Sequence, residues 1–199
     1  MAFTWTNTAA TTAAVTNRFV TSVNMANGAY TLANTTPVWS GACIVTATIT
    51  AVTGNDTAGT LTVVGVDLSG QTRTEVITLA AGSGGTGVVP FRTITSITQA
   101  GWVINVGNDT IVIGCAAGNI AAGTGGVLQG VLVNNTVATA FTVADATRTI
   151  LTVPVSQAAG TYYSFGAGVD FGGLLKVLTT STNDVTVFHS GTLPSTAAL

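Results

Sequence analysis

Residue types that catalyse reactions are scarce in this chain. Its 199 residues include one histidine, seven Asp and Glu residues, and five Lys and Arg residues. His189 is followed by Ser190, but a serine nucleophile also needs a third group that orients its histidine base, and no acidic residue is marked for that role. We therefore predict that the protein is not an enzyme, and we expect His189 to be a surface or interface residue near the end of a strand.

Paired carboxylates are the other catalytic pattern to consider, because glycosidases use two of them. Asp67 with Glu75 and Asp145 with Asp170 are the candidate pairs. Each of these residues falls at a predicted turn or strand end, where an acidic side chain has a structural use. A polysaccharide-degrading enzyme therefore remains only a remote alternative.

Two Asn-Asp turns contain the oxygen ligands that Ca²⁺ prefers. They are Asn55–Asp56 and Asn108–Asp109, each preceded by glycine. A tight turn needs the same residues for conformational reasons alone, so we predict structural turns and no metal site. The glycine-rich stretches are not followed by Lys-Ser or Lys-Thr, so we predict no phosphate-binding loop and no cofactor.

The low charge of the chain points to protein surfaces as its partners. Charged residues make up 6% of the sequence, against about a quarter in ordinary soluble domains. The net charge is −2 and the mean hydropathy is +0.58, so little repulsion separates two copies. The five basic residues are scattered, which argues against nucleic-acid binding, and the sequence contains no long apolar run that would enter a membrane. We expect a subunit that is seated against other protein.

The two cysteines, Cys43 and Cys115, each lie in a β-branched run. We predict buried free thiols, with a disulfide as the less favoured alternative. Residues 1–19 have neither a basic start nor a continuous apolar core, so we expect synthesis and first folding in a cytoplasm.

Short β-rich segments separated by Gly, Asn and Asp predict an all-β fold. The strands expected in the first part of the chain are Ala42–Val52, Thr60–Val66, Thr72–Leu79, Val88–Thr98, Trp102–Val106 and Thr110–Cys115. Arg73 and Glu75 share one strand face with Ile77, and we interpret them as a solvated pair. The glycine-rich stretch Ala80–Gly87 is predicted to be a flexible loop, most simply a hairpin connection.

We predict two small β-sandwich or barrel-like modules with an extended N-terminal arm. The arm and first strands cover residues 1–40, a β-rich module covers 41–122, and a second β-sandwich module covers 127–199. The glycine-rich stretch Ala121–Gly126 marks the boundary, because a fresh series of six β-rich segments begins after it.

The N-terminal segment is Ala-, Thr- and Asn-rich and carries spaced aromatic residues. Aromatic side chains in bland sequence often anchor a segment on a partner, so Phe3, Trp5 and Trp39 are our candidates for partner contacts. An edge strand lying on its own module is an equally good interpretation. If the segment is an arm, removing residues 1–20 leaves the modules folded and abolishes binding to the partner.

From Gly54 to Glu75 the chain reads GNDTAGTLTVVGVDLSGQTRTE, and from Phe91 it reads FRTITSIT. These segments resemble a family of virion proteins of tailed bacteriophages, in which a GND turn, a strand, a G-x-D-x-x-G turn, a T-E strand and an F-x-T-I-T-S-I segment recur. The resemblance covers Gly54 to about Gly118. The later segments VLQGVLVNNTVATAFTVAD and GTYYSF are similar to a small β-domain that often accompanies this pattern.

The resemblance implies a structural component of the particle and carries no catalytic residue over. We expect a decoration or cement protein that binds the major capsid protein on the outer capsid surface, as a homotrimer, and stabilises the head. The alternative is a head fibre or a tail or adaptor component that contacts the host. That role needs an exposed recognition surface, for which Tyr162, Tyr163 and Phe165 are the available aromatic cluster, although core packing explains them at least as well.

Overall fold

The computed structural model describes residues 4–8, 14–38, 41–50, 57–103, 109–122, 125–180 and 183–191. Within these ranges the chain forms 15 strands and no helix, which confirms the predicted all-β class. Among the same residues there is accordingly no helix long and apolar enough to cross a membrane.

The fold divides into two compact units, each assembled from separated segments of the chain. Unit 1 contains Met1–Ala13, Val38–Ala42 and Ala117–Leu199, and unit 2 contains Ala14–Pro37 and Cys43–Ala116. The predicted modules followed sequence order instead, with ranges 1–40, 41–122 and 127–199. The difference arises because β-sheets pair strands that are distant in sequence, so composition along the chain does not reveal where it passes from one unit to the other.

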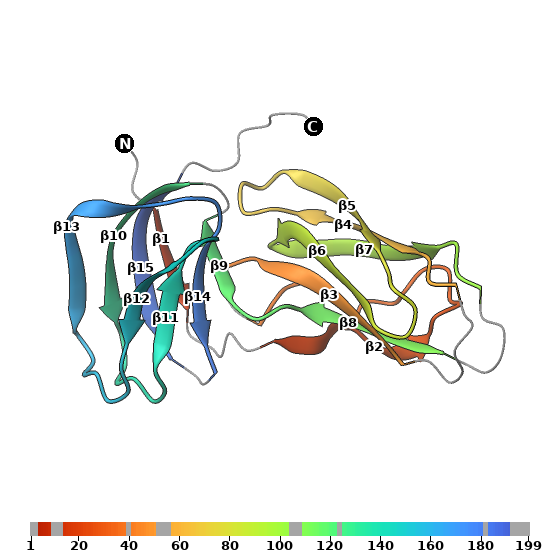
Figure 1. Cartoon of the computed structure of the whole chain (residues 1–199), viewed down its shortest axis with the longest axis horizontal. Helices are drawn as coiled ribbons and strands as arrows, with labels where there is room; N and C mark the ends of the chain where they lie inside the picture. Colours follow the sequence, from red (N-terminus) through yellow and green to blue (C-terminus); the bar gives the residue numbers. More distant parts are fainter. Residues whose placement is uncertain are drawn as a thin grey trace. The chain divides into compact units, whose positions relative to one another are not determined.

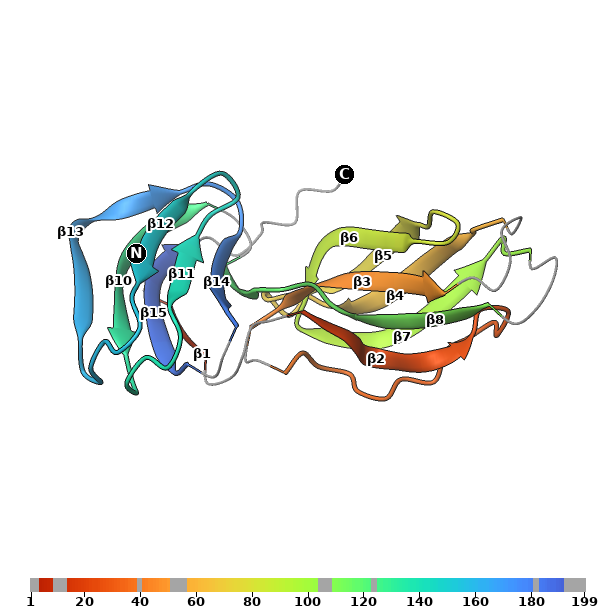
Figure 2. The ribbon, with the colours of Figure 1, turned by 60° about the horizontal axis from the view of Figure 1, so that its bottom comes forward.

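Unit 2 is a sandwich of two antiparallel sheets (Figure 1). The four-stranded sheet has the order β2-β8-β3-β6, and the three-stranded sheet has the order β5-β4-β7. Figure 2 shows the two sheets stacked face to face. The strands are β2 (Val15–Asn24), β3 (Cys43–Thr50), β4 (Thr60–Val66), β5 (Thr72–Thr78), β6 (Gly84–Phe91), β7 (Thr93–Ala100) and β8 (Thr110–Cys115).

Two of the strands in unit 2 have the predicted bounds, and one segment predicted as a single strand forms two strands. The predictions for β4 and β8 are confirmed residue for residue. The single strand predicted over Val88–Thr98 is divided at Arg92, where the chain leaves the β3 edge and joins β4 in the other sheet. The predicted loop Ala80–Gly87 is also shorter than expected, because β6 begins at Gly84. Of the predicted strand Trp102–Val106, the described part contributes a bridge between Val103 and Thr57.

The core of unit 2 is built from the alternate residues of these strands. In β4 the side chains of Leu61 and Val63 point inward and are fully buried, as the alternation in the sequence predicts. The largest fully buried side chains of the unit are Phe19, Met25, Leu61, Phe91, Ile94, Ile97, Ile111 and Ile113. Removing that much apolar surface from water is the main stabilising term of the unit.

Unit 1 is also a sandwich, made of two four-stranded antiparallel sheets (Figure 1). Their orders are β1-β15-β10-β13 and β12-β11-β14-β9. The strands are β1 (Thr4–Thr8), β9 (Asn119–Ala122), β10 (Gly126–Val133), β11 (Phe141–Ala144), β12 (Thr149–Val153), β13 (Tyr162–Phe171), β14 (Leu175–Thr179) and β15 (Val185–Gly191). Its core contains Leu128, Val131, Phe141, Val143, Leu175 and Val187, among others. With both units arranged as sandwiches, the predicted pair of small β-modules is confirmed at that level.

Two stretches of the N-terminal segment, Thr4–Thr8 and Val15–Asn24, are strands of the sheets. β1 pairs with β15 at the edge of one sheet of unit 1, and β2 pairs with β8 at the edge of one sheet of unit 2. Phe19 and Val20 in β2 are fully buried. Deleting residues 1–20 would remove an edge strand from unit 1 and core side chains from unit 2, so from the structure we now expect this deletion to destabilise both modules.

Candidate functional site

The carboxylate of Asp67 holds together the hairpin between β4 and β5. One oxygen, Oδ1, accepts hydrogen bonds from the backbone N–H of Ser69 (2.8 Å), the hydroxyl of Ser69 (2.6 Å) and the backbone N–H of Gln71 (3.0 Å). The other oxygen accepts from Arg73 Nε at 2.7 Å. Gly70 completes the turn with a φ of 79°, a backbone conformation that glycine adopts without strain.

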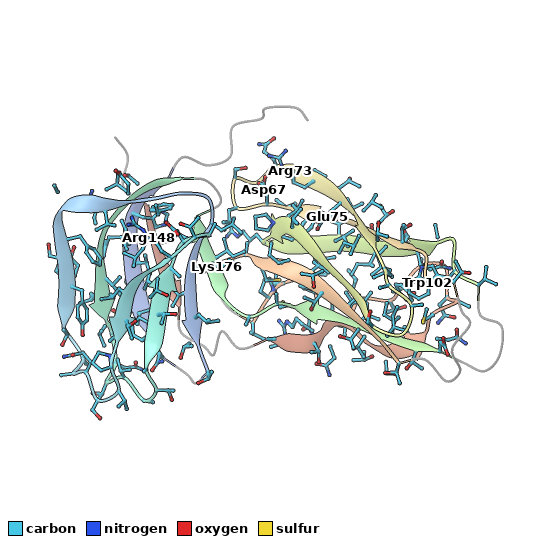
Figure 3. All side chains as sticks on the ribbon, in the orientation of Figure 1. Asp67, Arg73, Glu75, Trp102, Arg148 and Lys176 are labelled. Carbon is cyan, nitrogen blue, oxygen red and sulfur yellow. The ribbon has the colours of Figure 1, made fainter. Side chains whose placement is uncertain are left out.

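Burial of Asp67 by itself would raise the pKa of this carboxyl. The hydrogen bonds from Ser69, Arg73 and Gln71 outweigh that effect and lower its pKa below the ordinary value, so the group is ionised at neutral pH. Figure 3 shows Asp67 and Arg73 beside each other at the tip of this hairpin. The hydrogen bonds of Asp67 join the turn and the start of β5, which agrees with the sequence interpretation of an isolated turn residue.

Asp145 plays the same part in the hairpin between β11 and β12. Its Oδ1 accepts from the backbone N–H of Thr147 (2.8 Å), the hydroxyl of Thr147 (2.9 Å) and the backbone N–H of Arg148 (2.8 Å). The bond from the Thr147 N–H is the largest cause that lowers the pKa of Asp145 to about 2. Arg148 also donates to the backbone carbonyl of Asp170 on β13 at 2.8 Å, so this arginine links the turn of Asp145 to the backbone of the other member of the candidate pair.

Glu75 is buried between the two sheets of unit 2 and is not part of a solvated pair with Arg73. Its Oε1 accepts hydrogen bonds from the backbone N–H groups of Val88 and Val89 on β6. Its Oε2 has no hydrogen-bond partner among the described residues. The side chain fits because Gly87 has none: a Cβ there would lie 2.4 Å from Oε2. The prediction failed because alternation shows which residues share a face but not which face is buried.

Glu75 also links the edge strands of the two sheets of unit 2. β5 is the edge strand of one sheet and β6 is the edge strand of the other. The hydrogen bonds from Val88 and Val89 tie the two edges together, and the next residue, Pro90, has no N–H group to offer. Inward charges and edge prolines both prevent strands of other molecules from adding to a sheet.

His189 and Ser190 are adjacent on β15, and both are buried. Successive residues of a strand point to opposite faces, so this histidine is not placed to act as a base for this serine. The ring of His189 packs edge-on against Phe171, with centroids 6.4 Å apart, and burial lowers its pKa. The expectation of a surface or interface imidazole is therefore wrong, because the strand carries the ring into the interior.

The candidate calcium turns lie mostly outside the described residues. Asn55, Asp56 and Asn108 lie outside the described residues. Asp109 is described, and its side chain is fully buried. Within the described part of the chain, no three His, Cys, Asp or Glu side chains are grouped as metal ligands would be.

Of the three predicted partner-contact residues, Phe3 and Trp39 lie outside the described residues. Trp5 lies in β1, where its backbone is opposite Phe188 of β15. That pairing places Trp5 on an outer strand of unit 1, and the contact role of all three residues stays a prediction.

The aromatic cluster of β13 is divided between core and surface. Tyr163 and Phe165 are partly buried against the core of unit 1, and the Tyr163 hydroxyl donates to Gln157 Oε1 at 2.8 Å. Tyr162 is half exposed and its ring meets Phe188 edge-on, with centroids 5.9 Å apart. Only Tyr162 of the three therefore offers an open aromatic surface.

The surface carries fewer charged side chains than the sequence alone indicated, because several charged residues are buried. Asp67, Glu75, Asp109 and Asp145 are all buried. Among the residues that the structure describes, the exposed charged side chains are those of Arg92, Arg148 and Asp170. The exposed large apolar side chains include Val76 (61% exposed) on β5 and Val88 (79% exposed) on β6.

Comparison of the chain with protein-family models, curated proteins and solved structures finds no match.

Proposed function

We propose that this protein is a structural component of a tailed-bacteriophage particle. In this proposal it binds the major capsid protein on the outer capsid surface as a homotrimer and stabilises the head as a decoration or cement protein. The observation that carries the proposal is the small number of exposed charged side chains among the described residues of this all-β chain, those of Arg92, Arg148 and Asp170. Such a surface gives little repulsion between copies and suits a subunit that is seated among other subunits.

The use of the carboxylates supports a non-catalytic role. Asp67 and Asp145 cap hairpins, and Glu75 joins two strand edges. A glycosidase needs two carboxylates on either side of an accessible cleft, with oxygens free to move protons. These three are buried and hydrogen-bonded to backbone groups, which favours the structural interpretation over the remote enzymatic one.

The motif residues that resemble phage virion proteins have a folding role in this chain. Gly65 leaves room for Phe91, since a Cβ at position 65 would lie 2.7 Å from the Phe91 ring. Asp67 and Gly70 form the hairpin, and Glu75 reaches β6. The resemblance therefore rests on residues that specify a sandwich, which fits a scaffold seated on a lattice more readily than a site for a ligand.

The proposal is tested with particles that lack the protein. Heads assembled without it should form but lose their genome at a lower temperature than complete heads, and adding the purified chain should restore the difference. Failure of the purified chain to bind such heads would overturn the proposal. Binding to host cells instead of heads would favour the alternative of a fibre or tail component.

A surface variant, tested on the same heads, shows whether the exposed face of β5 is part of the contact. Val76→Ser removes an exposed apolar group from β5 without touching the core. Normal binding by this variant would place the contact surface elsewhere on the chain. In either case the binding of the unmodified protein decides the proposal itself.

A further inference from the structure

Cys43 and Cys115 lie side by side in the interior of unit 2. Cys43 is on β3 and Cys115 is on β8, two neighbouring antiparallel strands in the middle of the four-stranded sheet. Both side chains are fully buried and both are free thiols in this structure, as the sequence predicts. Their sulfur atoms are 2.9 Å apart although the residues are 72 positions apart in the chain.

The backbone around the two cysteines holds them in this arrangement. Cys115 pairs with Val45, and the N–H of Ala116 donates to the carbonyl of Ile44 at 2.9 Å. A disulfide bond is about 2.05 Å long, so its formation requires the sulfurs to approach by less than about 1 Å. Side-chain adjustment alone can supply such a movement, without a change in strand pairing.

We propose that Cys43 and Cys115 are a disulfide-forming site, which is converted to an intramolecular disulfide by a small-molecule disulfide oxidant such as glutathione disulfide. The inference rests on the geometry of unit 2 and does not depend on the proposed function. It adds a modification site to a chain whose structure shows reduced thiols.

The chemistry takes two exchange steps. The thiolate of one cysteine attacks a sulfur of glutathione disulfide, which forms a mixed disulfide and releases one glutathione thiolate. The second cysteine then attacks the protein sulfur of the mixed disulfide, forms the Cys43–Cys115 bond and releases the second glutathione. The two cysteines lose two electrons and two protons, and the oxidant gains them as two glutathione thiols.

Burial makes the first step slow in the folded protein. The interaction with Cys115 and burial both raise the pKa of the Cys43 thiol, so the reactive thiolate is scarce. Glutathione disulfide also cannot reach a fully buried sulfur. Oxidation is therefore expected to be fast while unit 2 is open or folding, and slow once it is closed.

The experiment uses the full chain, purified in its reduced state. One sample is refolded from urea with glutathione disulfide, and another is incubated folded with the same oxidant. Thiols are then counted in denaturant, the intact mass is measured, and peptides are mapped without reduction. The expected result is loss of both thiols in the refolded sample, no retained glutathione, a Cys43–Cys115 peptide, and reversal by dithiothreitol.

Stability provides an independent readout. Because the bond closes a long loop of the unfolded chain, it should raise the thermal midpoint of unit 2 by about 10 °C. Cys43→Ser and Cys115→Ser are the matched variants, and each should retain one glutathione after the same treatment. Two thiols still present after oxidative refolding, or glutathione retained on both cysteines, would overturn the proposal.

Discussion

Replacing Glu75 with alanine should destabilise unit 2 far more than a substitution at a neighbouring position of the same strand. The side chain supplies the acceptor for two backbone N–H groups of β6, those of Val88 and Val89. Alanine leaves both donors without that acceptor. It also removes the link between the edge strands β5 and β6.

The magnitude follows from the hydrogen bonds that are lost. A donor left unsatisfied in a protein costs about 1–3 kcal/mol. Both bonds of Glu75 are only partly buried, so water can reach part of this region once the carboxylate is gone. We therefore expect a loss of about 2–4 kcal/mol in the free energy of unfolding. Glu75→Gln keeps an acceptor oxygen but loses its charge, so its loss should be about half as large.

The assay is urea unfolding followed by circular dichroism, combined with hydrogen exchange of the peptide that contains β6. Thr74→Ala is the matched control, because Thr74 is exposed on the same strand. Glu75→Ala should also aggregate more on storage, measured as increased light scattering, since the edge of β6 is no longer protected. If Glu75→Ala unfolds within about 0.5 kcal/mol of the unmodified protein, the carboxylate does not have the role assigned to it.

Three further predictions concern other buried contacts. Gly87→Ala should cost about 1–2 kcal/mol because the new Cβ displaces the pinned Glu75 carboxylate, whereas Gly28→Ala, which meets open space, should be nearly neutral in the same urea titration. Asp145, whose pKa is lowered to about 2, stabilises the folded state above its unfolded pKa of 3.8, so the advantage over Asp145→Asn should shrink as the pH falls from 3.8 to about 2. His189, whose pKa is lowered by burial, favours the folded state above pH 6.5, so urea midpoints should fall on acidification below that value and His189→Phe should flatten the slope.

Alternation and turn chemistry were sufficient to predict much of the strand content. β4 and β8 are flanked by Gly, Asn and Asp and have regular β-branched sequences, so their bounds could be read directly. The turn between β4 and β5 was equally legible, since Asp67 and Gly70 are residues that such a hairpin requires. Local signals of this kind are visible in the sequence because the residues that cause them are close together.

Features that depend on distant residues were not visible. The division at Arg92 is set by which strand each half pairs with, β3 before it and β4 after it. The burial of Glu75 depends on Gly87 and on two N–H groups of another strand. Charge alone favoured solvent for Glu75, yet Glu75 is buried and its apolar neighbour Val76 is exposed. In each case tertiary pairing overrode a local preference.

For the candidate site, the sequence could indicate only which residues are poor catalytic candidates. His189, Asp67 and Asp145 could be judged poor catalytic candidates from their sequence surroundings, and the contacts of the two aspartates agree with turn roles. The proximity of Cys43 and Cys115 could not be read from the sequence, because it is created by the pairing of β3 with β8.

The measurement that tests the proposed role most directly is the copy number of this protein in purified particles, determined by quantitative mass spectrometry against the major capsid protein. The proposal predicts a number of the same order as the capsid protein itself, because a decoration protein occupies every equivalent position of the lattice. A handful of copies per particle would contradict it and would move the protein to a fibre, collar or tail.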